Sequence, residues 1–262
     1  MSAYYYLAKM RVLATLAYRF EVFVSIGTNV MMMLATLFLW KTAFQGVSSS
    51  ILNEQQMLAF TLISVVLSSM FVCNVANKIN QQIREGDIAL DLVKPVSLLM
   101  CYLAEDIGSS ISSLVNKALP MFLMLAVLFR VPLPVSPAAA LLFLASVLLS
   151  YAILWLLSAL VGLTAFWVTE LGPLEVVKDA IVRILSGSLI PLWYFPGWVQ
   201  HVLAFTPFPY TYQSPLGIYV GKIDSLAALQ SMGIQAVWIL ILGLTVHRVW
   251  IRAKRSTMVQ GG

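Results

Sequence analysis

Apolar residues run through this chain in six stretches, each long enough to cross a membrane as a helix, which needs roughly 20 residues. The stretches cover residues 21–44, 57–76, 107–129, 138–167, 178–195 and 227–249. The fifth is the most interrupted, because Gly187 and Pro191 lie within it and Pro196 follows it directly. The pattern predicts an all-α membrane protein with six transmembrane helices, forming a single transmembrane domain over residues 1–262.

The composition supports a membrane environment. Hydrophobic residues make up 60% of the chain and charged residues 10%, whereas a soluble domain carries about 25% charged residues. The six stretches leave no room for a separate soluble domain of ordinary size. The two cysteines, Cys73 and Cys101, are too few for a disulfide framework or a structural zinc site.

Basic residues are distributed unequally between the two sides of the predicted bundle. Of the 16 Lys and Arg residues, twelve fall on the side that holds both termini, three fall on the other side, and Lys117 lies within the third stretch. The positive-inside rule therefore predicts that both termini are cytoplasmic. We expect a multi-pass protein of the bacterial cytoplasmic (inner) membrane, which contacts lipid and binds no nucleic acid.

Residues 1–20 combine apolar and aromatic residues with Lys9, Arg11 and Arg19. We expect an amphipathic interfacial helix that lies on the inner leaflet, with these basic residues toward the lipid headgroups. The alternative is a basic, partly ordered tail.

The segment 77–95, between the second and third stretches, has the pattern of a short amphipathic hairpin. Four apolar residues recur in it at near-helical spacing: Ile79, Ile83, Ile88 and Leu92. Gly86 is placed to end one short helix, and Asp87 is placed to cap the next. A charged cytoplasmic hairpin of this kind suits a groove on a partner protein, and a solvated loop is the alternative.

The loop after the fourth stretch is short and acidic, on a side where basic residues prevail. Glu170 and Glu175 are placed to meet basic residues of a partner. The alternatives are pairing with Lys178 or capping of the fifth helix, where Glu175 in the first turn favours the helix dipole.

Residues 186–215 are too rich in proline and glycine to form one straight helix. Irregular backbone at membrane depth is tolerated only where protein or water surrounds it, and the aromatic residues here suit the outer interface. We therefore expect a broken fifth helix followed by short re-entrant outer helices. These either gate a translocation path or form an ordinary aromatic belt with a structured outer loop.

Lys117 is the one ionisable residue deep inside a predicted span. Such residues usually face a cavity or the bundle interior and mark function, so Lys117 is a candidate for the transport pathway. The alternatives are pairing with Glu105 or Asp106, three turns away, or snorkelling to the interface. A stripe of small residues beside it predicts close helix packing: Gly108, Ser109, Ser112 and Ser113.

No pattern in the chain predicts catalysis or ATP binding. The P-loop sequence G-x-x-x-x-G-K-[ST] does not occur. His201 and His247 fall on opposite sides of the predicted membrane and cannot share a metal. Glu105 and Asp106 are adjacent, so they point in different directions on a helix and form a poor acid–base pair. We expect no catalytic, cofactor-binding or metal site on this chain, and hence no enzyme.

Several segments together resemble one family. They read IREGDIALDLVKP (83–95), FWVTE (166–170), SGSLIPL (186–192) with Phe195-Pro196, PFPY (207–210) and PLGIY (215–219). In this order and spacing they make nearly the whole chain similar to the permease subunit of a bacterial ABC transporter. The similarity is to the ABC-2 superfamily, in its short "ABC-2 family transporter protein" branch, with a fold like that of type II ABC exporters. Lys94 departs from the arginine expected before Pro95 and loses bidentate geometry while keeping the charge.

The resemblance implies a half-transporter. A second copy or a paralogue of this permease would join it, together with two copies of a separately encoded ATPase that carries ATP and Mg. It implies four residues that couple to the ATPase, with Glu170 as a further contact: Arg84, Glu85, Gly86 and Asp87. It also implies four residues of an outer gate: Gly187, Pro191, Phe195 and Pro196. We expect export of a hydrophobic or amphipathic substrate; the alternatives are an assembly component that moves no solute, or a lipid-modifying membrane enzyme.

Overall fold

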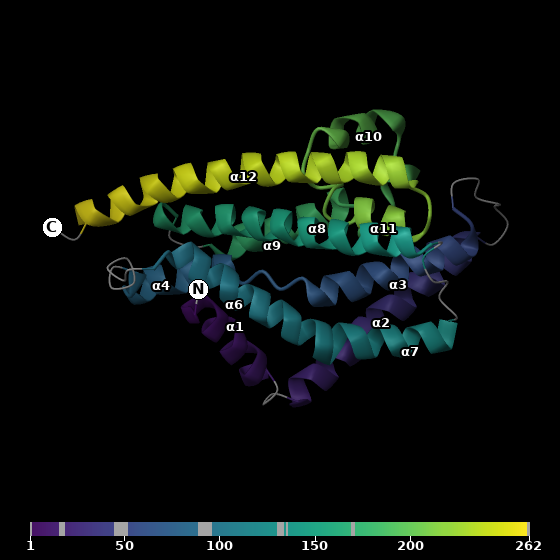
Figure 1. The fold of residues 1–262 in the computed structure, drawn as a ribbon, viewed down its shortest axis with the longest axis horizontal. Coiled ribbons are helices and arrows are strands. Elements are labelled where there is room, and N and C mark those ends of the chain that lie inside the picture. Colours follow the sequence, from purple (N-terminus) through teal and green to yellow (C-terminus); the bar gives the residue numbers. More distant parts are fainter. Residues whose placement is uncertain are drawn as a thin grey trace.

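The computed structural model describes residues 2–15, 19–44, 52–88, 96–129, 134, 136–168 and 171–260, and every regular element in these ranges is helical (Figure 1). The α-helices are α1 (Ser2–Thr15), α2 (Arg19–Phe44), α3 (Glu54–Met70), α4 (Val75–Glu85), α6 (Leu98–Ser113), α7 (Leu119–Phe129), α8 (Pro137–Leu163), α9 (Gly172–Leu185), α10 (Gly197–Ala204), α11 (Gln213–Tyr219) and α12 (Ser225–Gln260). A π-helical turn, η1 (Leu114–Ala118), joins α6 to α7. Two 3₁₀ turns, η2 (Thr164–Phe166) and η3 (Leu192–Tyr194), follow α8 and precede α10. The predicted all-α class is confirmed.

Four helical stretches are long and apolar enough to cross a membrane: Glu54–Glu85, Leu98–Met124, Pro137–Phe166 and Ser225–Lys254. The apolar part of α2, Val24–Trp40, is shorter than these four stretches and shorter than the roughly 20 residues that cross a membrane. α9 has 14 residues, which span about 21 Å at 1.5 Å per residue, against a hydrocarbon core of about 30 Å. The protein is therefore a multi-pass membrane protein, whereas the six-span arrangement stays a prediction.

Three predicted helix boundaries are wrong. The third helix begins at Leu98, nine residues before the predicted start, because Leu98, Leu99 and Tyr102 are buried in the core. The fifth does not run over 178–195, since α9 ends at Leu185 and the chain turns at Gly187 with φ +81°. The sixth continues to Gln260 and reaches 36 residues.

The centre of the bundle is α8. It packs most extensively against α12, and it also contacts α4, α11 and α9. α4 lies at the same end of the bundle as the carboxyl end of α12, whereas α10 and α11 lie toward the other end (Figure 1). We call these the α4 end and the α10 end.

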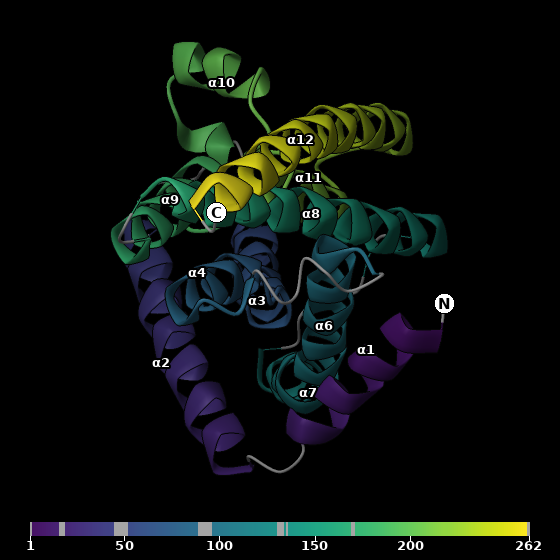
Figure 2. The same cartoon turned by 90° about the vertical axis from the view of Figure 1, so that its left-hand side faces the viewer.

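Residues 2–15 form a helix at the edge of the bundle, as predicted. α1 crosses α6 (Figure 2), and the small-residue stripe allows the close approach, because the Cβ of an alanine at Gly108 would overlap the backbone of Ala8. Tyr5 and Tyr6 are exposed on its outer face. That α1 lies on the inner leaflet stays a prediction.

Candidate functional site

The second membrane helix is interrupted near the α4 end. α3 ends at Met70, residues 71–74 are not helical, and α4 begins at Val75. None of the four residues is glycine or proline, the usual causes of a sharp break in a helix. This 71–74 break makes α4 a short helix of its own, joined to α3 by an extended connection (Figure 1).

Hydroxyl groups of α6 and α8 replace the backbone hydrogen bonds that are lost at the 71–74 break. Tyr151 Oη and Ser110 Oγ donate to the Val72 carbonyl oxygen at 3.1 and 3.3 Å. Ser158 Oγ donates to the Cys73 carbonyl oxygen at 3.3 Å. Backbone polar groups without partners are costly inside a membrane, so these side chains are what allow the break to exist there.

A buried ion cluster joins α4 to three other helices. Lys78 Nζ of α4 lies 2.9 Å from Asp106 Oδ1 and 3.0 Å from Glu105 Oε2, both on α6. Glu105 also pairs with Arg11 of α1 at 3.1 Å, and Trp155 Nε1 of α8 donates to Asp106 Oδ2 at 3.1 Å. Asp106 is completely buried. The two cations balance the two carboxylates, and because an unpaired buried charge is costly, the cluster fixes the position of α4.

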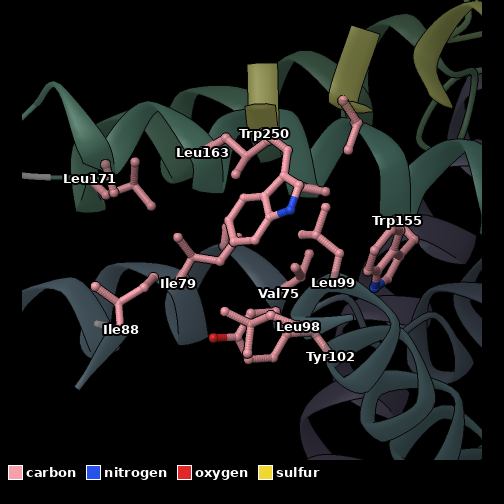
Figure 3. Close-up of a cluster of buried hydrophobic side chains, with 14 residues drawn as sticks. Val75, Ile79, Ile88, Leu98, Leu99, Tyr102, Trp155, Leu163, Leu171 and Trp250 are labelled. Atoms are coloured by element: carbon pink, nitrogen blue, oxygen red, sulfur yellow. The ribbon is translucent and has the colours of Figure 1, made fainter. Parts of the chain in front are cut away.

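An apolar cluster seats α4 on α8 and α12. Ala76 and Ile79 of α4 are completely buried. The indole of Trp250 reaches from α12 toward Ile79, with Leu163 of α8 beside it (Figure 3). Gly162 of α8 makes this fit tight, because an added Cβ would lie only 2.7 Å from Ala76 Cα.

Residues 84–87, predicted to couple to an ATPase, form the exposed tip of α4. Gly86 adopts φ +80° and its N–H donates to the Ile83 carbonyl oxygen at 3.3 Å, so the helix ends there as predicted. Residues 89–95 and Glu170 lie outside the described residues. A second capped helix in the hairpin and a contact through Glu170 therefore stay predictions.

Glu175 lies in the first turn of α9, outside the four candidate spans, and its Oε1 accepts a hydrogen bond from Asn77 Nδ2 of α4 at 3.1 Å. Burial raises the pKa of the Glu175 carboxyl above its usual 4.5, although nearby Lys178 opposes the rise. Lys178 forms its ion pair with Asp179, at 2.9 Å, and also donates to Ser158 Oγ at 3.2 Å. Lys178 therefore reaches the same hydroxyl that holds the 71–74 break.

The predicted broken outer region consists of short elements. The chain turns at Gly187, where an added Cβ would overlap the side-chain oxygen of Gln213. Gln213 Oε1 accepts a hydrogen bond from Leu192 N at 3.1 Å, and Gln213 N donates to the Ser186 carbonyl oxygen at 3.0 Å. The other predicted gate residues lie in the connection around η3, just before α10: Pro191, Phe195 and Pro196. Their role as a gate stays a prediction.

Lys117 lies in η1, within the candidate span Leu98–Met124, and is half-buried. Glu105 and Asp106, its candidate partners, pair with Lys78 instead, and Lys117 has no ion pair within the part of the chain that the structure describes. π-helical turns occur frequently at functional sites. A place in the transport pathway stays a prediction for Lys117.

A cavity of about 190 Å³ opens beside the 71–74 break. Phe71 and Cys73 of the break form one part of its wall, and Leu154 of α8 forms another. Lys178 and Arg183 of α9 supply charged groups to the lining. The cavity therefore adjoins both the break and the charged side of α9. Among the described residues, no three His, Cys, Asp or Glu side chains are grouped as metal ligands.

The sequence identifies the family to which this chain belongs. The sequence from residue 30 to residue 261 matches the family described as "ABC-2 family transporter protein". The chain belongs to this family. The match begins within α2 and continues through α12, and so includes the 71–74 break, α4 and the cavity. No curated protein and no solved structure matches the chain.

Family membership makes the chain a membrane component of an ABC-2 transporter. Such components are typically non-catalytic permeases, and they generally work with an ATPase partner. The exposed tip of α4 lies at one end of the membrane bundle, as a surface for such a partner requires.

The sequence does not predict two features of this ABC-2 membrane component: the 71–74 break and the pairing of Lys78 with Asp106. The break has no signal within its own residues, because its cause is the row of hydroxyls on α6 and α8. Ser110, which lies among the serines of the small-residue stripe, donates to the Val72 carbonyl oxygen of the break. Ser113 of the stripe donates to the Ser69 carbonyl oxygen at 2.6 Å, in the last turn of α3 before the break. A serine-rich stripe facing an apolar helix is therefore the one signal that could have indicated it.

Proposed function

We propose that this chain is the permease of an ATP-driven exporter of a hydrophobic or amphipathic substrate. Two copies of a separately encoded ATPase drive it, and a second permease, identical or paralogous, completes the translocation path. The observation that carries the proposal is the construction of α4, a short helix with an exposed charged tip, joined to α3 through the 71–74 break and fixed to α6 and α8.

The contacts of α4 supply a route by which an ATPase moves the membrane helices. A force on residues 84–87 reaches α6 through the Lys78–Asp106 pair and reaches α8 at the tight contact between Ala76 and Gly162. The 71–74 break lets α4 tilt without bending α3. The carbonyl oxygens of Val72 and Cys73 accept hydrogen bonds from side-chain hydroxyls of α8 and not from backbone N–H groups of a helix. Hinges of this kind absorb backbone change in a few residues.

In this proposal the α4 end faces the cytoplasm. Basic residues of two separate elements gather there, including Arg84 on α4 and Arg252 on α12. The α10 end carries Lys222, in the turn before α12. This asymmetry agrees with the positive-inside rule, and it supports a tip of α4 that is accessible to a cytoplasmic ATPase.

Co-purification tests the proposal. The tagged permease is solubilised in mild detergent with its co-expressed ATPase, and the recovered ATPase is quantified for the wild type, Arg84→Glu and Asp87→Arg. Lys222→Glu, at the opposite end, is the matched control. We expect roughly tenfold or greater loss of ATPase from the tip variants, the range for lost interfacial charge contacts, and full recovery with the control.

Two outcomes contradict the proposal in different ways. Unchanged recovery of ATPase from both tip variants shows that residues 84–87 are not the coupling surface. Normal recovery of ATPase, combined with no ATP-dependent movement of any amphiphile tested in reconstituted vesicles, shows a component that assembles with an ATPase and moves no solute.

A further inference from the structure

We infer that the 190 Å³ cavity beside the 71–74 break binds the anionic headgroup of an amphipathic substrate, held by Arg183 and Lys178. The inference rests on the proposed transport function and adds the chemical class of what is transported.

The cavity lies beside a candidate membrane span. Leu154 and Leu157 in its wall fall in the inner part of the candidate span Pro137–Phe166, away from both of its ends. Charged side chains at such depth are costly unless they pair or face a cavity, and they usually mark a ligand path. Lys178 and Arg183 border this cavity, so a ligand that enters it can meet both cations.

Arg183 is an exposed residue of α9 that borders the cavity. Its guanidinium makes no ion pair and no side-chain hydrogen bond with any residue in the described ranges. Lys178 already neutralises Asp179, at 2.9 Å, which leaves Arg183 as the net positive charge of the lining. A guanidinium offers five N–H donors in a fork that matches phosphate and carboxylate oxygens.

The size of the cavity limits what enters it. Pockets that bury a whole drug-sized molecule measure roughly 300–1,000 Å³, so a cavity of about 190 Å³ admits a polar headgroup and not a long apolar tail. Apolar side chains remain uncovered on α9, with Ile184, next to Arg183, 53% exposed and Val176, about two turns away, 69% exposed. A charged headgroup inside and an apolar tail along α9 together describe an anionic amphiphile.

The same site contacts the element that we propose to move. Lys178 Nζ donates to Ser158 Oγ at 3.2 Å, and Ser158 Oγ donates to the Cys73 carbonyl oxygen at 3.3 Å. A headgroup that attracts Lys178 into the cavity competes with the Lys178–Ser158 hydrogen bond. It thereby changes the hydroxyl group that supports the Cys73 carbonyl oxygen of the 71–74 break. Occupancy of the cavity thereby reaches α4.

Binding of dodecyl phosphate tests the inference. The permease–ATPase complex is reconstituted in phosphatidylcholine nanodiscs, and binding is measured calorimetrically against empty nanodiscs. We expect saturable binding to the wild type, and affinity weaker by roughly tenfold or more in Arg183→Met, as for the loss of a hydrogen-bonded charge. Arg183→Lys keeps the charge but not the forked guanidinium, so we expect its affinity to lie between those of the wild type and Arg183→Met. Arg252→Met, an exposed position on α12, binds as the wild type does.

Three results overturn the inference. Equal affinity of Arg183→Met and the wild type removes Arg183 from the site. Inorganic phosphate that binds as tightly as dodecyl phosphate indicates a site for a free anion and not for an amphiphile. Saturable binding of dodecyltrimethylammonium in place of dodecyl phosphate gives the headgroup the wrong charge. None of these results affects the proposed function as long as the ATPase co-purifies with the wild-type permease. If no ATPase co-purifies with the wild type, the proposed function is refuted, whatever the cavity binds.

Discussion

Gly162→Ala is a small change at the point where α4 meets α8. The new Cβ would lie 2.7 Å from Ala76 Cα and 3.2 Å from Ile79 Cδ1, whereas carbon atoms pack best at about 3.5–4.0 Å. The Ile79 methyl can rotate away, but the Ala76 backbone can retreat only if α4 moves by about 1 Å. Overpacking of this kind costs roughly 1–3 kcal/mol.

Helix propensity acts in the opposite direction, since alanine is favoured over glycine inside a helix by about 1 kcal/mol. Gly243→Ala isolates this gain, because no atom of the described structure lies within 4 Å of its new Cβ. We therefore expect Gly162→Ala to be less stable than Gly243→Ala by roughly 1–3 kcal/mol, and to couple ATP hydrolysis to transport less well.

The assay compares thermal unfolding of the two variants in one detergent, together with transport per ATP hydrolysed in the reconstituted complex. A Gly162→Ala protein that matches Gly243→Ala in both measurements would show that α4 is not seated on α8 at Gly162. The seat would then lie elsewhere, and the proposed route from α4 to α8 would be wrong.

Two further predictions concern charge. Lys78→Met leaves Asp106 completely buried without its ion-pair partner, so we expect a loss of roughly 3–5 kcal/mol. Asp106→Asn costs less stability, because Lys78 keeps its ion pair with Glu105 at 3.0 Å. We expect the Lys78→Met/Asp106→Asn double variant to be more stable than Lys78→Met alone. If the two stability losses in thermal unfolding are additive, the Lys78–Asp106 ion pair is contradicted. For Glu175, a raised folded-state pKa means that the folded protein binds more protons than the unfolded chain, so stability falls as pH rises from about 4.5 through the raised value. Glu175→Gln should remove this part of the dependence of melting temperature on pH, and identical pH profiles would refute it.

The sequence predicts the elements that depend on local pattern. Gly86 ends α4 because only a residue tolerant of positive φ fits there. Gly108 marks the crossing of α1 and α6, as expected of a small residue in a packed stripe. The proline- and glycine-rich stretch after α9 divides into short helices for the reason given by its composition.

The features that the sequence does not predict depend on partners distant along the chain. The 71–74 break requires Tyr151 Oη from α8, and nothing near residue 72 announces that contact. Asp106 pairs with Lys78 because α4 lies beside α6. Lys117 lies eleven residues from Asp106, which is about 16 Å along a helix and too far for an ion pair, so the partner of Asp106 emerges only once α4 is placed.

The distribution of contacts separates a fixed frame from a movable part. α8 and α12 pack along most of their length, and the fully buried Gln235 of α12 donates to Ser150 Oγ at 3.1 Å and to the Tyr210 carbonyl oxygen at 2.8 Å. Satisfied buried networks of this kind rigidify a core.

α4 is held differently. Ala76 and Ile79 seat it in the apolar cluster, whereas the 71–74 break that joins it to α3 is held by a few directional hydroxyl contacts. Packed cores shift between discrete arrangements and do not deform continuously, which favours motion at a junction held by a few polar contacts. The structure places such a junction between the proposed ATPase surface and the cavity. A transporter needs these two sites to influence each other, and the Lys178–Ser158–Cys73 contacts give that influence a physical path.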